Sequence, residues 1–285
     1  MVEETRACIR RVIECQGVEK GLICADEETG IANAVLDSRL GGCDLVRLIA
    51  GGVALSLSLL VGTLQQAAAD EWGGSLDLTS DYIVRGISRS NDQAALQVDL
   101  HYLNTSGFLA GVFASNSRID PTQPVDVEVD GFLGFGWIVG PDWRGKILAT
   151  HYAYPGPRHG FDYTYDELDL DWTYQEWLNM SVTYSPDAPR FSFYRGGWVS
   201  VAAESAEVSL QRPVLGKLSL TAGAGYAFYG GPDSGGYGYG SVGAAYDLSP
   251  VTLVLSFVDT TAGAKTLFYN VPSGRQWTGT VIWRF

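Results

Sequence analysis

The sequence predicts an all-β fold, a transmembrane antiparallel up-and-down β-barrel of about 12 strands that follows an N-terminal signal peptide. Three observations lead to this fold class. Segments of about ten residues alternate apolar with polar side chains, turn residues separate these segments, and aromatic residues gather near their ends. This combination is typical of barrels in which one face of every strand meets lipid and the other face lines the interior.

The chain divides into three segments before the strands are considered in detail. Residues 1–44 contain all four cysteines, at spacings that match no common zinc site, and we assign this extension no role. It is either a start placed too far upstream or an unusually long leader. Residues 45–69 join a basic flank, an apolar run and a small-residue pattern at Ala67 and Ala69, which predicts a signal peptide cleaved after Ala69. Residues 70–285 then form the barrel.

A single transmembrane helix is the alternative for the apolar run from Leu48 to Leu64. This run is short for a bilayer span of about 20 residues, and it contains glycine and serine, which weaken helices. A signal peptide therefore explains the run better.

The composition narrows the classes of function. The net charge is −13 and lysine is scarce, which argues against a nucleic-acid partner. The 35 glycines and the 12% of aromatic residues are above ordinary usage. Strands, tight turns and a boundary between water and lipid all favour such a mixture.

The strand pattern is clearest in residues 217–229, where Leu218, Leu220, Tyr226 and Phe228 alternate with small or polar residues. Successive side chains of a strand point to opposite faces, so one face is apolar and the other polar. The same alternation recurs in residues 96–102, 125–129, 166–174 and 276–285, whereas residues 146–154 are mixed on both faces.

The connections between these segments alternate in length. We expect short turns at Asn104–Gly107, Gly140–Trp143, Gln175–Trp177, Pro213–Gly216 and Asp247–Pro250. Longer links are expected near Gly86–Asp92, Ser117–Pro124, Pro155–Thr164, Ser185–Gly197, Gly230–Gly236 and Thr260–Arg275. Short turns on one rim and long loops on the other are typical of outer-membrane barrels, and an even number of strands places both barrel ends on the short-turn rim.

A water-soluble sandwich or barrel is the competing fold, and it would bury the apolar face. Two features argue against it. The polar faces carry too many Asp, Glu, Ser and Thr side chains to pack a dry core without unsatisfied groups. The apolar faces end in aromatic residues, as a girdle at a lipid interface requires: Tyr102, Trp137, Trp172, Tyr174, Tyr184, Tyr226, Trp277 and Trp283.

The alternation also predicts which side chains line the pore. These are Asp77, Asp81, Arg85, Asp99, His101, Asp126, Glu128, Asp130, Lys146, Glu167, Asp169, Asp171, Glu207, Asp247 and Arg284, together with Lys217. Carboxylates in a narrow aqueous pore concentrate cations and repel anions. The alternative is that these groups pair with one another and fill a narrow barrel.

Asp81 and Arg85 are four residues apart, so a single strand would point both of them inward, about 13 Å apart. At that distance they do not pair with each other, but each can meet a charge on a neighbouring strand. The pair then either forms a constriction or fixes the register of the strands, and the second role is the commoner one for paired charges.

Several motifs resemble those of a known family. The segment Ser80–Ser88, with the sequence SDYIVRGIS, is similar to the opening of the TorF-type porin family. The segments Gly107–Asn116, Tyr152–Gly156, Tyr184–Asp187 and Ser256–Thr260 are similar to that family's later motifs and occur in the same order. The final strand ends in Phe285, which resembles the signature read by the barrel-insertion machinery of outer-membrane proteins. The resemblance covers residues 70–285 and implies a barrel in the bacterial outer membrane.

These observations favour a porin-like channel for passive diffusion of small polar or cationic solutes through an acidic lumen. The expected partners are the lipid bilayer, the insertion machinery and the solutes, and no cofactor or metal is expected. A non-conducting structural or surface-binding barrel is the first alternative. An outer-membrane hydrolase is the second; it would need a nucleophile beside His101 or His151, and no motif for one is present, so we predict that the protein is not an enzyme.

Overall fold

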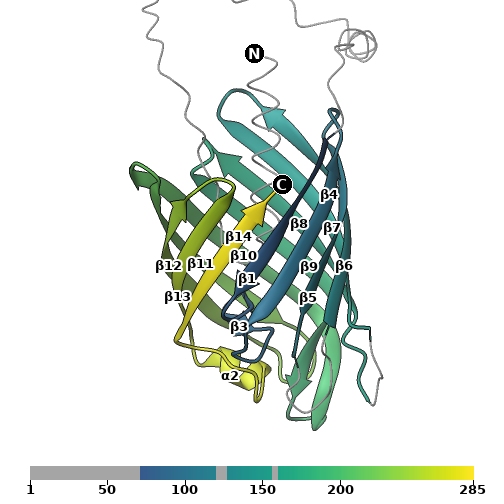
Figure 1. Ribbon diagram of the computed structural model, residues 1–285. Coiled ribbons are helices and arrows are strands. Elements are labelled where there is room, and N and C mark those ends of the chain that lie inside the picture. Colours follow the sequence, from purple (N-terminus) through teal and green to yellow (C-terminus); the bar gives the residue numbers. More distant parts are fainter. Residues whose placement is uncertain (1–70, 120–126, 156–159) are drawn as a thin grey trace, which may run out of the picture. The chain divides into compact units, whose positions relative to one another are not determined.

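The computed structural model describes residues 71–119, 127–155 and 160–285. Within these residues, twelve strands form one closed antiparallel barrel in which β1 pairs with both β14 and β4 (Figure 1). The predicted fold is therefore confirmed. The expected extension, the signal peptide with Ala67 and Ala69, and Asp126 lie outside the described residues.

The barrel strands follow one another along the chain, apart from one small hairpin. They are β1 (Glu71–Thr79), β4 (Ala95–Leu103), β5 (Phe108–Asn116), β6 (Val127–Val139), β7 (Trp143–Ala153), β8 (Tyr165–Tyr174), β9 (Leu178–Ser192), β10 (Gly197–Leu215), β11 (Leu218–Tyr229), β12 (Gly235–Asp247), β13 (Val251–Thr260) and β14 (Gln276–Arg284). The strands β2 (Ile83–Val84) and β3 (Ile87–Ser88) form the separate hairpin, and α2 (Gly263–Leu267) is a short helix. Within the described residues, no helix has the length and apolarity needed to cross a bilayer.

Side chains of opposite character alternate across the wall of the barrel. In β1, Leu76 and Leu78 are 37% and 55% exposed, whereas Asp77 between them is 2% exposed. The exposed leucines and valines of the other strands continue this outer belt. The polar residues therefore share the inner face, as the period of two predicts.

Aromatic rings border the apolar belt at both ends. Near the short turns, ring centroids are 5.3 Å apart in Trp72–Tyr102 and 4.8 Å apart in Trp143–Tyr174. At the opposite end, the centroids of Phe257 and Trp277 are 5.1 Å apart. Two aromatic borders around an apolar band are what a barrel embedded in lipid presents to its surroundings.

One of the predicted long links is wrong. The segment Ser185–Gly197 is mostly strand, because β9 continues to Ser192 and β10 begins at Gly197. Its prolines, Pro186 and Pro189, suggested a loop. However, β8 pairs with β9 only as far as Tyr184, so beyond that residue β9 has a free edge, where a strand tolerates proline.

The tip of this extended β9–β10 hairpin is held by Asp233, from the link between β11 and β12. Its carboxylate accepts hydrogen bonds from the Ser192 hydroxyl at 2.7 Å and the Tyr194 amide at 2.9 Å, and these bonds lower the pKa of Asp233. A lowered pKa stabilises the tip at pH values above the ordinary aspartate pKa, and the effect is lost as the pH falls through the lowered pKa.

We therefore expect Asp233→Asn to loosen the tip at neutral pH and to change nothing in strong acid. Amide hydrogen exchange of residues 192–196 measures this; equal exchange at neutral pH would contradict it.

Glycine is required at one of the short turns. Gly107 has a φ of +99°, and a Cβ there would lie 2.1 Å from the Gly136 carbonyl oxygen. Gly140 has a φ of +68° but has open space around it.

We expect Gly140→Ala to cost roughly 1–2 kcal/mol of unfolding free energy from backbone strain. Gly107→Ala should cost this strain energy and, in addition, ~1–3 kcal/mol from the overlap with Gly136. Urea unfolding in lipid vesicles compares the two variants, and equal losses would contradict the close approach.

Candidate functional site

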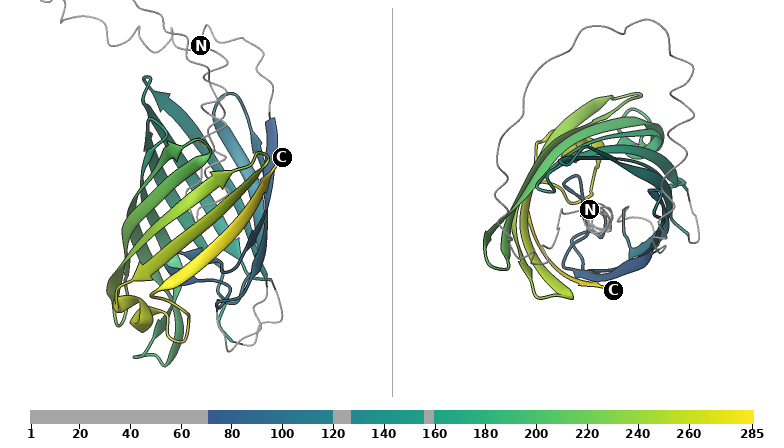
Figure 2. Two further views of the ribbon diagram at one scale, coloured as in Figure 1. Left: turned by 60° about the vertical axis from the view of Figure 1, so that its left-hand side comes forward. Right: turned by 90° about the horizontal axis from the view of Figure 1, so that it is seen from above.

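The chain between β1 and β4 folds into the barrel rather than away from it. Figure 2 shows this segment inside the ring of strands, and its β2–β3 hairpin buries Tyr82, Ile83 and Ile87. At the tip, Arg85 and Gly86 have φ values of +48° and +78°, as in the two-residue turns that reverse a tight hairpin. The expectation that one strand carries both Asp81 and Arg85 and points them inward is therefore wrong. We call residues 80–94 the inner hairpin.

Asp81 holds the base of the inner hairpin together. Its carboxylate accepts hydrogen bonds from the hydroxyls of Ser88 at 2.6 Å and Ser90 at 2.8 Å, and the Ser90 oxygen accepts one from the Tyr82 amide. Burial raises the pKa of Asp81, and the two serine hydroxyls partly oppose this rise. Because Asp81 is buried within the inner hairpin, we assign it a structural role there and do not count it among the residues that face water in the lumen.

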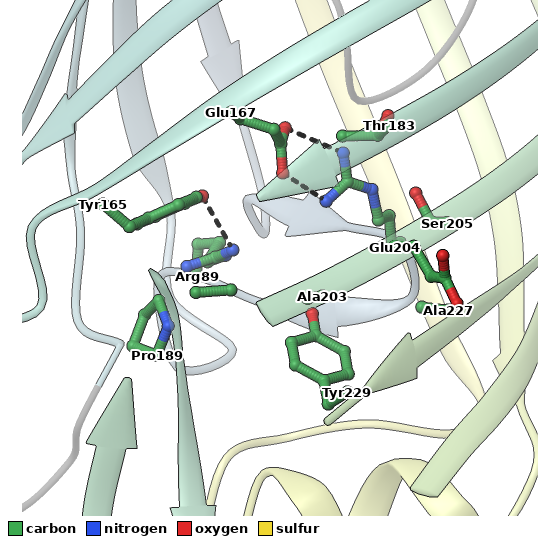
Figure 3. Close-up of a pocket in the computed structure, with 12 residues that line it drawn as sticks. Arg89, Tyr165, Glu167, Thr183, Pro189, Ala203, Glu204, Ser205, Ala227 and Tyr229 are labelled. Carbon is green, nitrogen blue, oxygen red and sulfur yellow. Dashed lines mark hydrogen bonds and ion pairs between the residues drawn. The ribbon is translucent and has the colours of Figure 1, made fainter. Parts of the chain in front are cut away.

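Arg85, at the tip of the inner hairpin, contacts the barrel wall on the side nearly opposite β1. Its two terminal nitrogens donate to the two carboxylate oxygens of Glu167 on β8, each at 2.8 Å, and the Glu167 side chain is 3% exposed (Figure 3). The Tyr152 hydroxyl donates to the same carboxylate at 3.2 Å. In the ring of strands, β8 lies five strands from β1 in one direction and seven in the other. The ion pair is therefore made on the side nearly opposite β1.

A second set of contacts runs beside this ion pair. The Arg89 guanidinium donates to the hydroxyls of Tyr154 and Tyr165, each at 3.3 Å. Glu128 on β6 accepts hydrogen bonds from the hydroxyls of Tyr82 at 2.5 Å and Tyr154 at 2.8 Å. The inner hairpin is thus bonded to β6, to Tyr154 directly after the end of β7, and to β8. Arg89 was not among the predicted interior residues, because it falls in the expected link near Gly86–Asp92.

Two apolar clusters close around the inner hairpin at the long-loop end. One joins Ile87 to residues of β9–β12 and to Leu267, Phe268 and Val271 of the β13–β14 link. The other joins Ile119 to Tyr152, Tyr154, Tyr163 and Tyr165. Much of the packed core of the molecule therefore lies at this mouth of the barrel. Nearer the short turns the inner wall is largely polar, with two smaller apolar clusters, one of Leu103, Leu109 and Leu148 and one of Ala245 and Ile282.

Most of the other predicted pore-lining residues share that polar inner wall. Asp77, Asp99, Asp130, Lys146 and Asp169 are buried, and His101, Asp171, Glu207 and Arg284 are partly buried. Some are paired: Lys146 Nζ lies 2.8 Å from Asp171, and His101 Nδ1 lies 2.5 Å from Asp99. Arg284 donates to Thr252 at 2.9 Å.

Two predicted residues lie at the short-turn rim instead. Asp247 ends β12, and its carboxylate accepts the Ser249 amide at 2.7 Å, so it shapes a turn. Lys217 is exposed in the β10–β11 turn and does not enter the interior. Arg144 was missed: it is buried and pairs with Glu176 at 2.7 Å. Within the described parts of the chain, no group of three or more His, Cys, Asp or Glu side chains is arranged to hold a metal ion.

A small hollow remains beside the two arginines (Figure 3). Arg85, Arg89, Tyr165, Glu167 and Tyr229 form its polar side. Its other side is made largely of short side chains, including Ala188, Ala203, Ser205 and Ala227. The hollow lies where the inner hairpin meets the inner faces of β8–β11.

Comparisons with solved structures find porins of similar architecture. NanC porin shares 9% identity, with 74% of this chain and 98% of that chain covered, at a TM-score of 0.47. KdgM porin shares 7% identity over 75% and 99% of the two chains, with a TM-score of 0.46. Salmonella typhi OmpF, in complex with daunomycin, shares 7% identity over 76% and 97%, with a TM-score of 0.40.

Comparisons of sequence give fewer matches than comparisons of structure. No curated protein matches the chain. The TorF-type assignment that the motifs suggested is not confirmed. A family model described as a bacterial protein of unknown function, Gcw_chp, matches residues 65–283. Since this match spans most of the sequence, the chain belongs to the Gcw_chp family.

Proposed function

We propose that the protein is a porin-like channel of the bacterial outer membrane, through which small polar solutes and cations diffuse passively. One observation carries this proposal: a closed barrel has a largely apolar outer wall and a largely polar inner wall, in which buried carboxylates outnumber buried basic groups. Ionised carboxylates are costly to bury without water or a partner. A water-filled interior would hydrate such carboxylates, which would then attract cations and repel anions.

The proposal includes how the protein reaches the membrane. Residues 45–69 direct export and are removed after Ala69, and the mature barrel enters lipid with its aromatic borders at the two interfaces. Phe285 closes the barrel beside β1, where its amide donates to the Gly74 carbonyl at 3.1 Å. We propose that this terminal strand is also read by the insertion machinery.

Deleting Phe285 should then reduce assembly in cells more than it reduces refolding into vesicles from denaturant. Equal losses would mean that Phe285 only helps to close the barrel beside β1.

A non-conducting barrel is the second candidate, and a specific observation favours it. The inner hairpin and two apolar clusters pack the long-loop mouth. In this case the loops would act as a surface for binding. The Nδ1 atoms of His101 and His151 face the carboxylates of Asp99 and Asp166, as the histidine of a catalytic triad also does. Within the described residues, however, neither ring is hydrogen-bonded to a hydroxyl or thiol nucleophile, so the hydrolase alternative gains no support.

Swelling of proteoliposomes separates the channel from the non-conducting barrel. Vesicles that contain the purified protein are diluted into isotonic solutions of small neutral sugars, and swelling is followed by light scattering. The channel predicts swelling that slows as the sugar grows larger. Swelling no faster than that of empty vesicles, with the protein folded, would contradict the proposal.

Neutralising inner carboxylates should reduce the preference for cations. Asp77 and Asp99 face inward from the adjacent strands β1 and β4. We expect Asp77→Asn combined with Asp99→Asn to lower the cation-to-anion permeability ratio by roughly twofold or more, because each carboxylate adds to the local potential. The reversal potential in a KCl gradient measures this ratio. Asp166→Asn, on the exposed outer face of β8, is the matched control and should leave it unchanged.

A further inference from the structure

We infer that the inner hairpin is the size-selecting constriction of the channel, and that the Arg85–Glu167 ion pair is the latch that holds it across the lumen. This inference rests on the proposed function, because a constriction has meaning only in a barrel that conducts. It names the residues that decide which solutes pass. Three features of the inner hairpin support it.

The first feature is that the inner hairpin reaches across the lumen. Its two ends continue into β1 and β4, which are neighbours in the ring of strands. Two of its contacts are made far from these strands: Tyr82 with Glu128 on β6, and Arg85 with Glu167 on β8. On the other side, the Ser88 amide donates to the Pro272 carbonyl of the β13–β14 link at 3.0 Å. A segment bonded to both sides in this way must lie in the path of a solute.

The second feature is the close fit of the hairpin tip. A Cβ at Gly86 would lie 2.3 Å from the Thr260 Cγ2 atom and 3.2 Å from the Tyr239 Cβ atom. The backbone of the tip therefore lies directly against β12 and β13, with no space for a side chain. Because this side is filled, no solute can pass between the hairpin tip and β12 or β13.

The third feature is the hollow on the opposite side of the tip, between the two arginines and the short side chains of β9–β11. The hollow is only large enough for about one water molecule, so we infer that a larger solute passes here only when the inner hairpin moves. Arg85 and Glu167 border this space, so their ion pair sets its width. No covalent bond ties the tip to the wall. If the ion pair is lost, the hairpin can move, and larger solutes should then pass.

The latch is tested by changing its charges. We expect Glu167→Gln to raise the largest sugar size that supports swelling and to increase single-channel conductance several-fold. Glu176→Gln removes the carboxylate of a rim ion pair and should change neither. The charge exchange Arg85→Glu with Glu167→Arg should restore the original size limit, because it rebuilds the ion pair with the partners reversed.

A reversible crosslink separates movement of the hairpin from general damage. Ile87 and Ser273 form an isolated antiparallel bridge, and partners of this kind are close enough for a disulfide between cysteines. Ile87→Cys and Ser273→Cys are combined with Glu167→Gln, in a chain whose four native cysteines are replaced by serine. Oxidation should restore the small size limit, and reduction should release it again. The single variant Ser273→Cys is the control and should not respond.

The outcomes distinguish this inference from the proposed function. If the unmodified protein conducts and neither Glu167→Gln nor the crosslink changes the size limit, the inner hairpin is not the constriction, and the channel stands. If neither the unmodified protein nor any latch variant conducts, although all fold, both conclusions fail.

Discussion

Replacing Leu133 with arginine is expected to lower the unfolding free energy of the barrel in lipid by about 2–4 kcal/mol. Leu133 is the seventh of the thirteen residues of β6, and its side chain is 59% exposed on the outer face. If that face meets the middle of a bilayer, the charge must enter hydrocarbon. In a water-soluble barrel, the same exposed position would accept arginine with little loss.

A second exposed leucine provides the matched control. Leu215 ends β10 at the short-turn rim and is 78% exposed. Leu215→Arg should cost only about 0–1 kcal/mol, because a charge near the interface remains hydrated. Urea unfolding of both variants in lipid vesicles, followed by tryptophan fluorescence, gives the comparison. Equal losses at the two positions would contradict the assignment of the outer wall to lipid.

The second large effect is expected at Glu128, where Glu128→Gln should cost about 1–3 kcal/mol. The carboxylate is 1% exposed and accepts hydrogen bonds from Tyr82 and Tyr154 through its two oxygens. The amide of glutamine keeps one acceptor oxygen and replaces the other with a donor. One buried tyrosine hydroxyl then loses its acceptor, which is the costly event.

Glu176→Gln is the control for this prediction as well. Its ion pair with Arg144 lies at the rim, with the Glu176 side chain 26% exposed, and contributes about 0–1 kcal/mol. The same unfolding assay applies to both substitutions. A loss at Glu128 no greater than that at Glu176 would show that the buried network contributes little to the barrel.

The barrel could be predicted from the sequence because its wall separates two very different surroundings. Leu76, Asp77 and Leu78 illustrate this: each side chain is assigned to lipid or lumen by its polarity, independently of any distant residue. The short turns were located for a similar reason, since the positive φ values at Gly107 and Gly140 favour glycine there. Local chemistry decides both features.

The inner hairpin could not be predicted in this way. The segment from Asp81 to Ser88 has the aromatic and β-branched residues that strands favour, and only its partners draw it inward. Those partners are remote in sequence: Glu128 lies 46 residues from Tyr82, and Glu167 lies 82 residues from Arg85. Alternation also carries no information about which inward charges will meet. The sequence therefore identified Glu128, Glu167 and Arg85 as inward residues but not as one network.

The prolines of β9 are a third feature whose structure could not be predicted from the sequence. Pro186 and Pro189 predict a loop in a central strand, and they are tolerated here only because β9 extends past β8. The lengths of neighbouring strands decide this, and a single segment does not reveal them.

The central claim is that the polar inner wall encloses water through which solutes pass. Single-channel recording of the purified protein in a planar bilayer, with a KCl gradient across it, tests this claim most directly. The account predicts discrete current steps and a reversal potential that favours cations. A correctly folded barrel that inserts and gives no steps would contradict the claim.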